Sequence, residues 1–177
     1  MLIGRKKEIQ ILKKIFRSSR AEFVVLYGRR RVGKTFLIRE FFNQEDCLFF
    51  QSTGLQKGSL KKQLRHFAEA MSQTFTHGVQ IKTPQSWDDA FRTLNQLVES
   101  KINERKVVIF MDELPWMATR KSGLLEALDY YWNHYWSAKS KVILIVCGSS
   151  ASWLVKNIIH NKGGLHNRCT FEIKLDP

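Results

Sequence analysis

The chain has 177 residues, 44% of them hydrophobic and 25% charged, which is the balance of one soluble globular domain with a well-buried core. No run of about 18 apolar residues predicts a transmembrane helix, and the first residues lack the apolar centre of a secretory signal, so we expect a cytoplasmic protein. The formal net charge of +13 favours anionic partners over cationic ones.

The first predicted element is a basic helix. Residues 5–17 place Ile9, Leu12 and Ile15 on one face at helical spacing. Residues 1–40 hold twelve lysines and arginines against three acidic residues, so most of the positive excess lies here. This charge could serve nucleotide phosphates, nucleic acid or an acidic protein partner, or it could form a solvated basic face. The sequence alone leaves these alternatives open.

A phosphate-binding loop follows the next predicted strand. Residues 22–27 indicate a buried strand, residues 36–42 a helix, and Gly28–Thr35 between them fits G-x-x-x-x-G-K-[ST]. The glycines allow a tight turn whose amides face a polyphosphate. Lys34 would reach the β- and γ-phosphates, and the Thr35 hydroxyl would bind Mg²⁺. We expect nucleotide contacts from Gly28, Arg29, Arg30, Arg31, Val32, Gly33, Lys34, Thr35 and Phe36.

An acidic pair ends a later strand. The elements predicted before it are a strand at residues 47–51, helices at residues 59–75 and 86–101, and an apolar strand at residues 106–111. This last strand runs into Asp112 and Glu113, the pattern of a Walker B segment. Asp112 can hold Mg²⁺ directly or through its water, and Glu113 can orient and deprotonate an attacking water. The alternative for Glu113 is a solvated loop carboxylate.

Small polar residues end the next strand. A helix is predicted at residues 123–136, and strands at residues 141–147 and 169–175. In P-loop ATPases with an additional strand between the two Walker strands, a polar residue after that strand contacts the γ-phosphate or the water. Ser149 is our first candidate for this role and Ser150 the second. The alternative is that Ser149, Ser150 or Ser152 caps the helix through Trp153 and Leu154.

The order of these elements predicts the fold class. Strands alternate with helices throughout, and the inner strands are continuously apolar, so we expect an α/β fold with a parallel sheet covered on both faces. The phosphate-binding loop would then lie at the carboxyl end of the first strand, where open α/β sheets bind ligands.

Other chemistry-bearing residues fit structural roles better. An aromatic cluster is expected to pack in the core or against another domain, although an exposed part could stack on a nucleic-acid base; it comprises Trp116, Tyr130, Tyr131, Trp132, Tyr135 and Trp136. Cys47, Cys147 and Cys169 lack metal spacing and are predicted to be buried thiols. His160 and His166 lack a third ligand, so we reject a zinc site.

The chain resembles the archaeal-type ATPases, P-loop proteins placed near the AAA+ and STAND ATPases. The matching segments are residues 3–5 with Glu8, residues 26–35, Met111–Trp116, Gly148–Ser150, and residues 165–168 running into residues 171–175. The resemblance implies a three-layer core whose sheet has the order 5-1-4-3-2, with the P-loop on the central strand. It also implies ATP as the ligand.

The resemblance adds three expectations about sites and domains. Gly4 and Arg5 would lie against the base and ribose side of the nucleotide. Arg168 would sense phosphate or act in trans on another subunit, with a salt bridge at the sheet edge as the simpler alternative. Family members continue into a helical lid and a winged-helix region, so we expect residues 1–177 to be the ATPase core alone, without a lid arginine.

These observations together predict an ATP- and Mg²⁺-binding P-loop ATPase module that hydrolyses ATP slowly, with Glu113, Lys34 and Ser149 as catalytic residues and Thr35 and Asp112 as Mg²⁺ ligands. One alternative is a nucleotide-dependent switch with little turnover, which could self-associate when nucleotide binds. Another is a DNA-binding module that uses the basic N-terminal face. A GTPase is disfavoured, because Asn161-Lys162-Gly163-Gly164 lacks the acidic residue that reads guanine.

Overall fold

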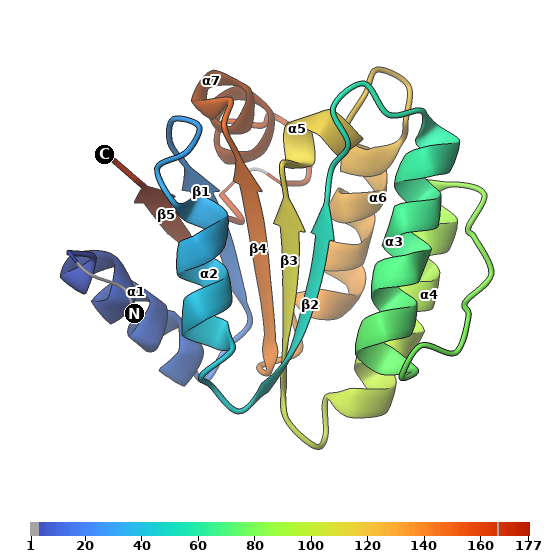
Figure 1. The fold of residues 1–177 in the computed structure, drawn as a ribbon, viewed down its shortest axis with the longest axis horizontal. Helices are drawn as coiled ribbons and strands as arrows, with labels where there is room; N and C mark the ends of the chain where they lie inside the picture. Colours follow the sequence, from blue (N-terminus) through green and yellow to red (C-terminus); the bar gives the residue numbers. More distant parts are fainter. Residues whose placement is uncertain (1–3, 166) are drawn as a thin grey trace.

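Five parallel strands form one sheet in the order β2-β3-β4-β1-β5 (Figure 1). The computed structural model describes residues 4–165 and 167–177. The strands are β1 (Glu22–Tyr27), β2 (Cys47–Thr53), β3 (Lys106–Asp112), β4 (Val142–Gly148) and β5 (Phe171–Lys174). All the pairings are parallel, so the predicted sheet and its strand order are confirmed. This is the fold of a P-loop NTPase core.

One expectation about the sheet is wrong. The central strand is β4, whereas the P-loop follows β1. β1 is still an inner strand, because β5 pairs along its other edge from Val24 opposite Phe171 to Tyr27 opposite Lys174. Three strands lie on one side of β1 and one on the other, so the P-loop emerges one strand away from the sheet edge.

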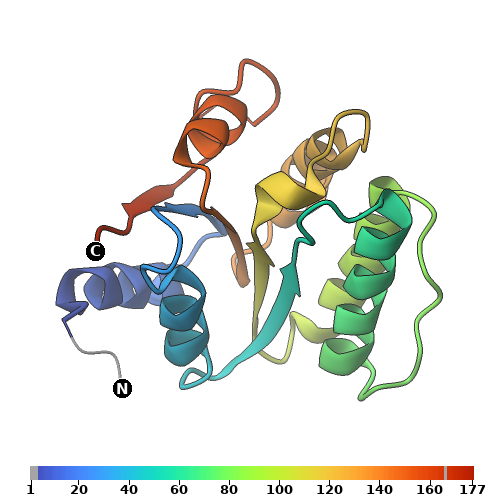
Figure 2. The same cartoon turned by 45° about the horizontal axis from the view of Figure 1, so that its top comes forward.

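Two helical layers cover the sheet, as Figures 1 and 2 show. Helices α1 (Lys6–Arg17) and α2 (Lys34–Phe42) pack on one face. The opposite face is covered by α3 (Leu60–Phe75), α4 (Trp87–Lys101), α6 (Leu124–Tyr131) and the π-helix η1 (Trp132–Trp136). Three short elements follow carboxyl ends of strands: α5 (Leu114–Met117) after β3, then α7 (Ala151–Leu154) and the π-helix η2 (Val155–Ile159) after β4.

The inner strands divide their side chains between these two layers. In β3, Val107, Ile109 and Met111 contribute to the core beneath α3, α4 and α6. The intervening Val108 and Phe110 contribute to the core beneath α1 and α2. All five are fully buried, and this two-sided burial explains why the strand is continuously apolar instead of alternating with polar residues.

Several element boundaries differ from the sequence-based expectation, and three of these differences have a visible structural cause. Helix α2 begins at Lys34, two residues earlier than expected, because Gly33 adopts the left-handed region (φ 89°) and is its N-cap. The helix expected at residues 123–136 changes to π geometry at Trp132, where the Ser137 amide donates to the Trp132 carbonyl at 2.9 Å. The last strand is shorter than the expected residues 169–175 because its pairing with β1 covers only Phe171–Lys174.

The aromatic cluster mainly serves the core, as expected. Tyr131, Trp132 and Trp136 are buried, whereas Tyr130 is 44% exposed and stacks on His134 with ring centroids 4.3 Å apart. The cysteines are unpaired; Cys147 is buried, and Cys47 and Cys169 are half-buried. Within the described ranges, no helix combines the length and apolar character needed to cross a membrane.

Candidate nucleotide-binding and catalytic site

The P-loop backbone depends on Gly28 and Gly33. At Gly28 (φ +155°) a Cβ atom would lie 2.2 Å from the carbonyl oxygen of Leu175, so no side chain fits between the loop and the end of β5. The Leu175 amide also donates to the Tyr27 carbonyl at 2.8 Å, which fixes this close approach. Arg31 (φ 64°) and Gly33 (φ 89°) adopt left-handed conformations that turn the chain into α2. The loop is therefore wound around the N-terminus of α2, the geometry that binds anions.

Lys34 lies inside the loop. Its Nζ donates to the carbonyls of Gly28 at 2.9 Å and Arg29 at 2.7 Å, and the residue is only 6% exposed. A buried ammonium group needs such partners because desolvation of a charge is costly. The loop therefore holds a positive charge at its centre.

The two predicted Mg²⁺ ligands are in contact. The Thr35 hydroxyl donates to Asp112 Oδ2 at 2.7 Å, across the gap between α2 and the tip of β3. Among residues 4–165 and 167–177, no three His, Cys, Asp or Glu side chains gather into a metal site of their own. Mg²⁺ in nucleotide sites needs no such cluster, because one or two protein oxygens combine with phosphate oxygens and waters. The hydroxyl and carboxylate oxygens here therefore fit Mg²⁺ bound with a nucleotide.

Glu113 is aimed differently from Asp112. It adopts the left-handed conformation (φ 49°, ψ 47°), which turns its side chain toward the end of β4. There Oε2 accepts hydrogen bonds from both the amide and the hydroxyl of Ser149, each at 3.1 Å. The sequence predicted both residues for the site, and the structure brings them together. A non-glycine residue held in this conformation at a strand end is a frequent mark of a functional position.

Arg30 and Trp116 form one wall of the site. The Arg30 guanidinium lies 5.3 Å from the centre of the Trp116 ring, and its Nε approaches Ser149 Oγ at 3.4 Å. A cavity of about 490 Å³ opens between this wall and the loop; it is lined by Arg30, Arg31, Gly33, Lys34, Thr35, Phe36, Glu113 and Trp116. Trp116 was predicted as part of the aromatic cluster and of the segment Met111–Trp116 that resembles the family, but no role in the site was predicted for it. Its position three residues after Glu113 was the signal for such a role.

Arg5 joins α1 to this site. Its guanidinium donates to the Val32 carbonyl at 3.1 Å and to the Asp176 carbonyl at 2.7 Å, and it pairs with Glu8 at 3.5 Å. A second cavity of about 490 Å³ lies beside the start of the loop and is lined by Tyr27, Gly28, Arg29, Ser149, Ala151, Lys174, Leu175, Asp176 and Pro177. Gly4 precedes Arg5 and is exposed. Arg5 thus supports the loop from the side of this cavity without lining it.

The remaining candidates lie at the edge of the site or away from it. Phe36 lines the first cavity but is 53% exposed. Ser150 is the N-cap of α7 but forms no side-chain cap hydrogen bond. Arg168 is exposed, and no ion pair joins it to another described residue, so the alternative of a salt bridge at the sheet edge finds no partner within the described ranges. Ile3 and His166, also part of the resemblance, lie outside the described residues.

Cys147 is a neighbour of the site that the sequence did not indicate. It is fully buried at the end of β4, and burial raises the pKa of its thiol well above the usual value. The nearby Asp112 carboxylate adds to the effect, whereas Lys34 opposes it. The thiol therefore stays protonated and serves as a small apolar group behind the Thr35–Asp112 pair.

Comparison with known proteins agrees with this geometry. Residues 2–177 match the family described as an ATPase domain predominantly from Archaea. The uncharacterized protein MJECL04 of Methanocaldococcus jannaschii is 25% identical over 178 residues, covering all of this chain and 36% of its own length. The uncharacterized ATP-binding protein MJ0423 of the same organism is 42% identical over 45 residues, covering 25% of this chain and 76% of its own length.

Solved structures show the same fold. The Walker-type ATPase PABY2304 of Pyrococcus abyssi matches 99% of this chain and 54% of its own, with a TM-score of 0.65 and 19% identity. The ORC2 protein of Aeropyrum pernix, solved with ADPNP and ADP, matches 98% of this chain and 48% of its own, with a TM-score of 0.66 and 15% identity. The chain thus spans about half the length of these structures. From its matched sequence pattern and its P-loop fold, the chain belongs to the family of ATPase domains found predominantly in Archaea.

Proposed function

We propose that this domain binds ATP with Mg²⁺ and hydrolyses it slowly to ADP and phosphate. The observation that carries the proposal is the convergence of Lys34, the Thr35–Asp112 pair and the Glu113–Ser149 pair at the carboxyl ends of β1, β3 and β4. Each group supplies a different part of phosphoryl transfer: phosphate binding, metal binding and water activation.

Lys34 and the loop amides would bind the β- and γ-phosphates. In the structure the Lys34 ammonium already lies among loop carbonyls, so it needs only a small shift to reach a phosphate oxygen. Thr35 and Asp112 would hold Mg²⁺ through their oxygens, and the ion would neutralise charge that develops on the phosphates. The hydrogen bond from the Thr35 hydroxyl to Asp112 Oδ2 keeps these two oxygens together where they would hold the ion.

Glu113 would act on the attacking water. Ser149 occupies its Oε2 with two hydrogen bonds, which leaves Oε1 to accept a proton. In the reaction, a water oxygen bonds to the γ-phosphorus, the bond to the bridging β,γ-oxygen breaks, and the water's proton passes to Glu113. Ser149 would thus position the base, and Arg30, next to Ser149, would be free to move toward the γ-phosphate.

The adenosine end of the nucleotide would lie beside Arg5, in the cavity between the loop and the C-terminal residues.

We further propose that residues 1–177 form the ATPase core of a longer cytoplasmic protein with a lid and a winged-helix region, and that Arg168 acts on a nucleotide held by a second copy. Its exposure is compatible with such a role in trans. Nucleotide-dependent self-association would bring Arg168 to the neighbouring site.

A switch with little turnover is the second candidate. The observation in its favour is that Ser149 holds Glu113 with two hydrogen bonds while Arg30 reaches Ser149 and stacks on Trp116. If the Ser149–Glu113 and Arg30–Ser149 contacts persist when ATP binds, the Glu113 carboxylate would not reach the attacking water. Trp116 fluorescence would report the change, because its indole would lose the Arg30 contact when Arg30 turns to phosphate.

The test is phosphate release by wild type and Glu113→Gln, with Glu126→Gln on the exposed side of α6 as a matched control. We expect Glu113→Gln to reduce the rate by about 10²–10⁴-fold, the usual contribution of a general base, while ATP binding persists. Glu126→Gln should behave as wild type. If wild type and Glu113→Gln released phosphate at the same background rate, the catalytic assignment would be lost and the switch would remain.

A further inference from the structure

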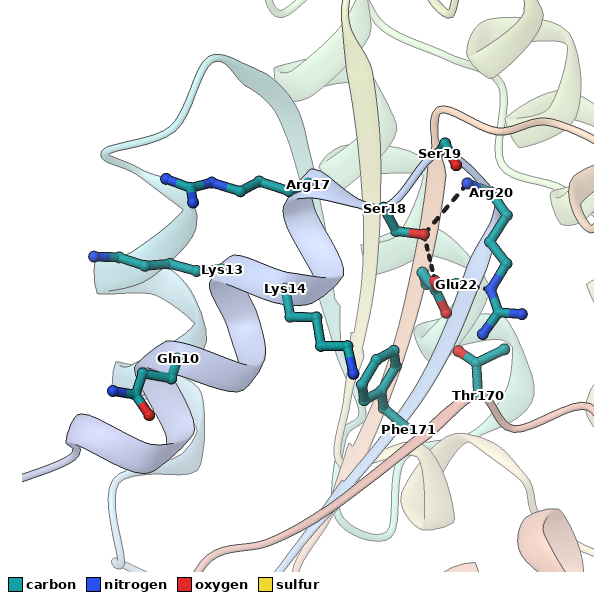
Figure 3. A pocket seen from close by; sticks show the side chains of 10 residues that line it. All are labelled: Gln10, Lys13, Lys14, Arg17, Ser18, Ser19, Arg20, Glu22, Thr170 and Phe171. Carbon is teal, nitrogen blue, oxygen red and sulfur yellow. Dashed lines mark hydrogen bonds and ion pairs between the residues drawn. The ribbon is translucent and has the colours of Figure 1, made fainter.

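A basic groove lies at the end of β1 opposite the P-loop, between α1 and the start of β5 (Figure 3). Its volume is about 900 Å³, and it is lined by Gln10, Lys13, Lys14, Arg17, Ser18, Ser19, Arg20, Glu22, Thr170 and Phe171. None of these residues contributes to the nucleotide site. We therefore consider a ligand for this groove other than the nucleotide of the P-loop site.

The positively charged side chains of the groove that form no ion pair with a described residue all belong to α1. Lys13, Lys14 and Arg17 are exposed, and none of them forms an ion pair with a residue in the described ranges. Lys13 and Arg17 are one helical turn apart and extend from the same side of α1 in Figure 3. Arg20 differs, because its Nε pairs with Glu22 at 3.2 Å. In the same view (Figure 3), Lys13 and Arg17 extend away from Phe171, whereas Lys14 extends toward it, so two of the three cations lie on the outer side of the rim and one on its inner side.

The floor of the groove is negative. Glu22 is 1% exposed, and its Oε1 accepts hydrogen bonds from the Ser18 hydroxyl at 2.5 Å and from Arg20. Its Oε2 is buried without a hydrogen-bond partner. Although Oε1 pairs with Arg20, a carboxylate below the cations disfavours a single small anion held deep in the groove. Cations spaced along a rim instead suit a polymer that carries a charge at each repeat.

The ring of Phe171 favours a nucleic-acid strand over an acidic peptide as the polyanion bound in the groove. Phe171, at the start of β5, is half-buried and faces Lys14, whose Nζ lies 5.7 Å from the ring centre. Cations beside a partly exposed aromatic ring are an arrangement on which nucleic-acid strands bind, because the cations contact phosphates and a base stacks on the ring; here Lys14 would turn from the ring to a phosphate. An acidic peptide would use the cations but gain nothing comparable from the ring.

We propose that this groove binds a nucleic-acid strand, with Lys13, Lys14 and Arg17 contacting successive phosphates. This goes beyond the proposed ATPase activity and does not depend on it, because the groove and the P-loop share no residue. Helix α1 joins the two places: Arg5 just before its start contacts the P-loop carbonyl of Val32, and Arg17 at its end lines the groove. Its 12 residues span about 18 Å at 1.5 Å per residue.

The experiment measures fluorescence anisotropy of a labelled single-stranded oligonucleotide, without ATP, over a series of salt concentrations. The variant Lys13→Glu/Arg17→Glu is compared with Lys61→Glu/Lys62→Glu, which makes the same charge change on exposed residues of α3 in the opposite layer. Losing two phosphate contacts should reduce the slope of log K against log salt by about 1.4 and weaken binding by about tenfold or more at low salt. The α3 variant should keep the wild-type slope.

Three results would overturn the proposal: no binding by the wild type at low salt, an equal loss in the α3 variant, or equal displacement of the oligonucleotide by polyglutamate and by unlabelled DNA. The second would show that net charge alone attracts the oligonucleotide, and the third that the groove accepts any polyanion. Thermal unfolding of both double variants verifies that each is folded; the mutated side chains are exposed, so their midpoints should match the wild type.

Discussion

The two helical layers of this domain differ in the size of the core that they form with the sheet and in their position relative to the nucleotide site. The layer of α3, α4 and α6 packs a continuous aromatic core on the sheet, in which Phe67 contacts Phe50, Trp87 and Phe91 with ring centroids 5.2, 5.3 and 5.8 Å apart. The layer of α1 and α2 has a smaller core, and both helices begin at functional groups: Arg5 precedes α1, and the P-loop runs into α2.

This difference indicates that stability and ligand binding are largely separated between the two faces of one sheet. The buried side chains of the aromatic layer stabilise the sheet, and none of those described lines either cavity beside the P-loop. The α3–α4–α6 layer buries the neutral polar side chains of Gln63, Ser72 and Asn95, whereas the α1–α2 layer holds the buried ammonium group of Lys34 and adjoins the positive-φ residues of the P-loop. Such groups cost stability and are retained where a ligand uses them.

The largest expected effect on stability is in the aromatic layer. Phe67→Ala should lower the free energy of unfolding by about 3–5 kcal/mol, because Phe67 is fully buried and its removal leaves a cavity among three rings. The ATP affinity of the folded fraction should stay unchanged. Chemical denaturation and calorimetry measure the two quantities, with Phe67→Leu as a smaller truncation. A loss of ATP affinity in folded Phe67→Leu would break the separation of the layers.

A smaller effect, on both properties, is expected at the P-loop. Gly28→Ala should lower stability by about 1–3 kcal/mol, because the new Cβ would meet the Leu175 carbonyl and the residue would keep a strained φ. Nucleotide affinity should fall as well, since the loop must move away from β5. The matched control is Gly78→Ala in the α3–α4 loop, where φ is also positive (+87°) but the nearest atom lies 4.0 Å away. Equal effects of the two changes on affinity would contradict this account of Gly28.

The smallest expected effect concerns the cysteines. Burial is the main cause that raises the pKa of Cys47 and Cys169 to about 11, and that of Cys147 well above its usual value, so all three thiols stay protonated at pH 8. Because these pKa values are higher in the folded than in the unfolded chain, the thiols favour folding below about pH 9, and stability falls as the pH rises toward 11.

Alkylation rates at pH 8 give the corresponding measurement. Every cysteine should react far more slowly in the native chain than in denaturant, and Cys147 most slowly because it is fully buried. ATP with Mg²⁺ should slow Cys147 further, since it lies behind Asp112, and should leave Cys169 unchanged. Equal protection of the two thiols by ATP would show that the nucleotide stabilises the whole domain instead of the α1–α2 side.

Much of the site could be predicted because its functional residues lie in short, recognisable sequence segments. Lys34 and Thr35 follow from a contiguous motif, and Asp112, Glu113 and Ser149 each follow a strand whose continuous apolar run is easily recognised. Parallel strands bring their carboxyl ends to one edge of the sheet, so these distant segments meet without further information. The strand order itself followed from the resemblance to a family, because local pattern does not determine which strands are neighbours.

The features that sequence reasoning missed depend on contacts across the fold. The left-handed conformation of Glu113 and the stacking of Arg30 on Trp116 arise where the P-loop, β3 and β4 meet. The basic residues of α1 were recognised, but the negative floor under them required Glu22 to be buried beside Ser18. The π geometry at Trp132 reflects the packing of its indole and that of Trp136 in the core, which no local spacing of residues specifies.

The central claim is that Lys34 and its loop bind the phosphates of ATP. Isothermal titration with ATP, ADP and GTP, with and without Mg²⁺, tests it on wild type, on Lys34→Ala and on Lys61→Ala as an exposed control. We predict saturable binding of ATP and ADP to the wild type and to Lys61→Ala, strengthened by Mg²⁺ for ATP. Lys34→Ala should lose about 2–5 kcal/mol of binding free energy. Undetectable heat with millimolar adenine nucleotides, or equal affinity in Lys34→Ala, would contradict the claim.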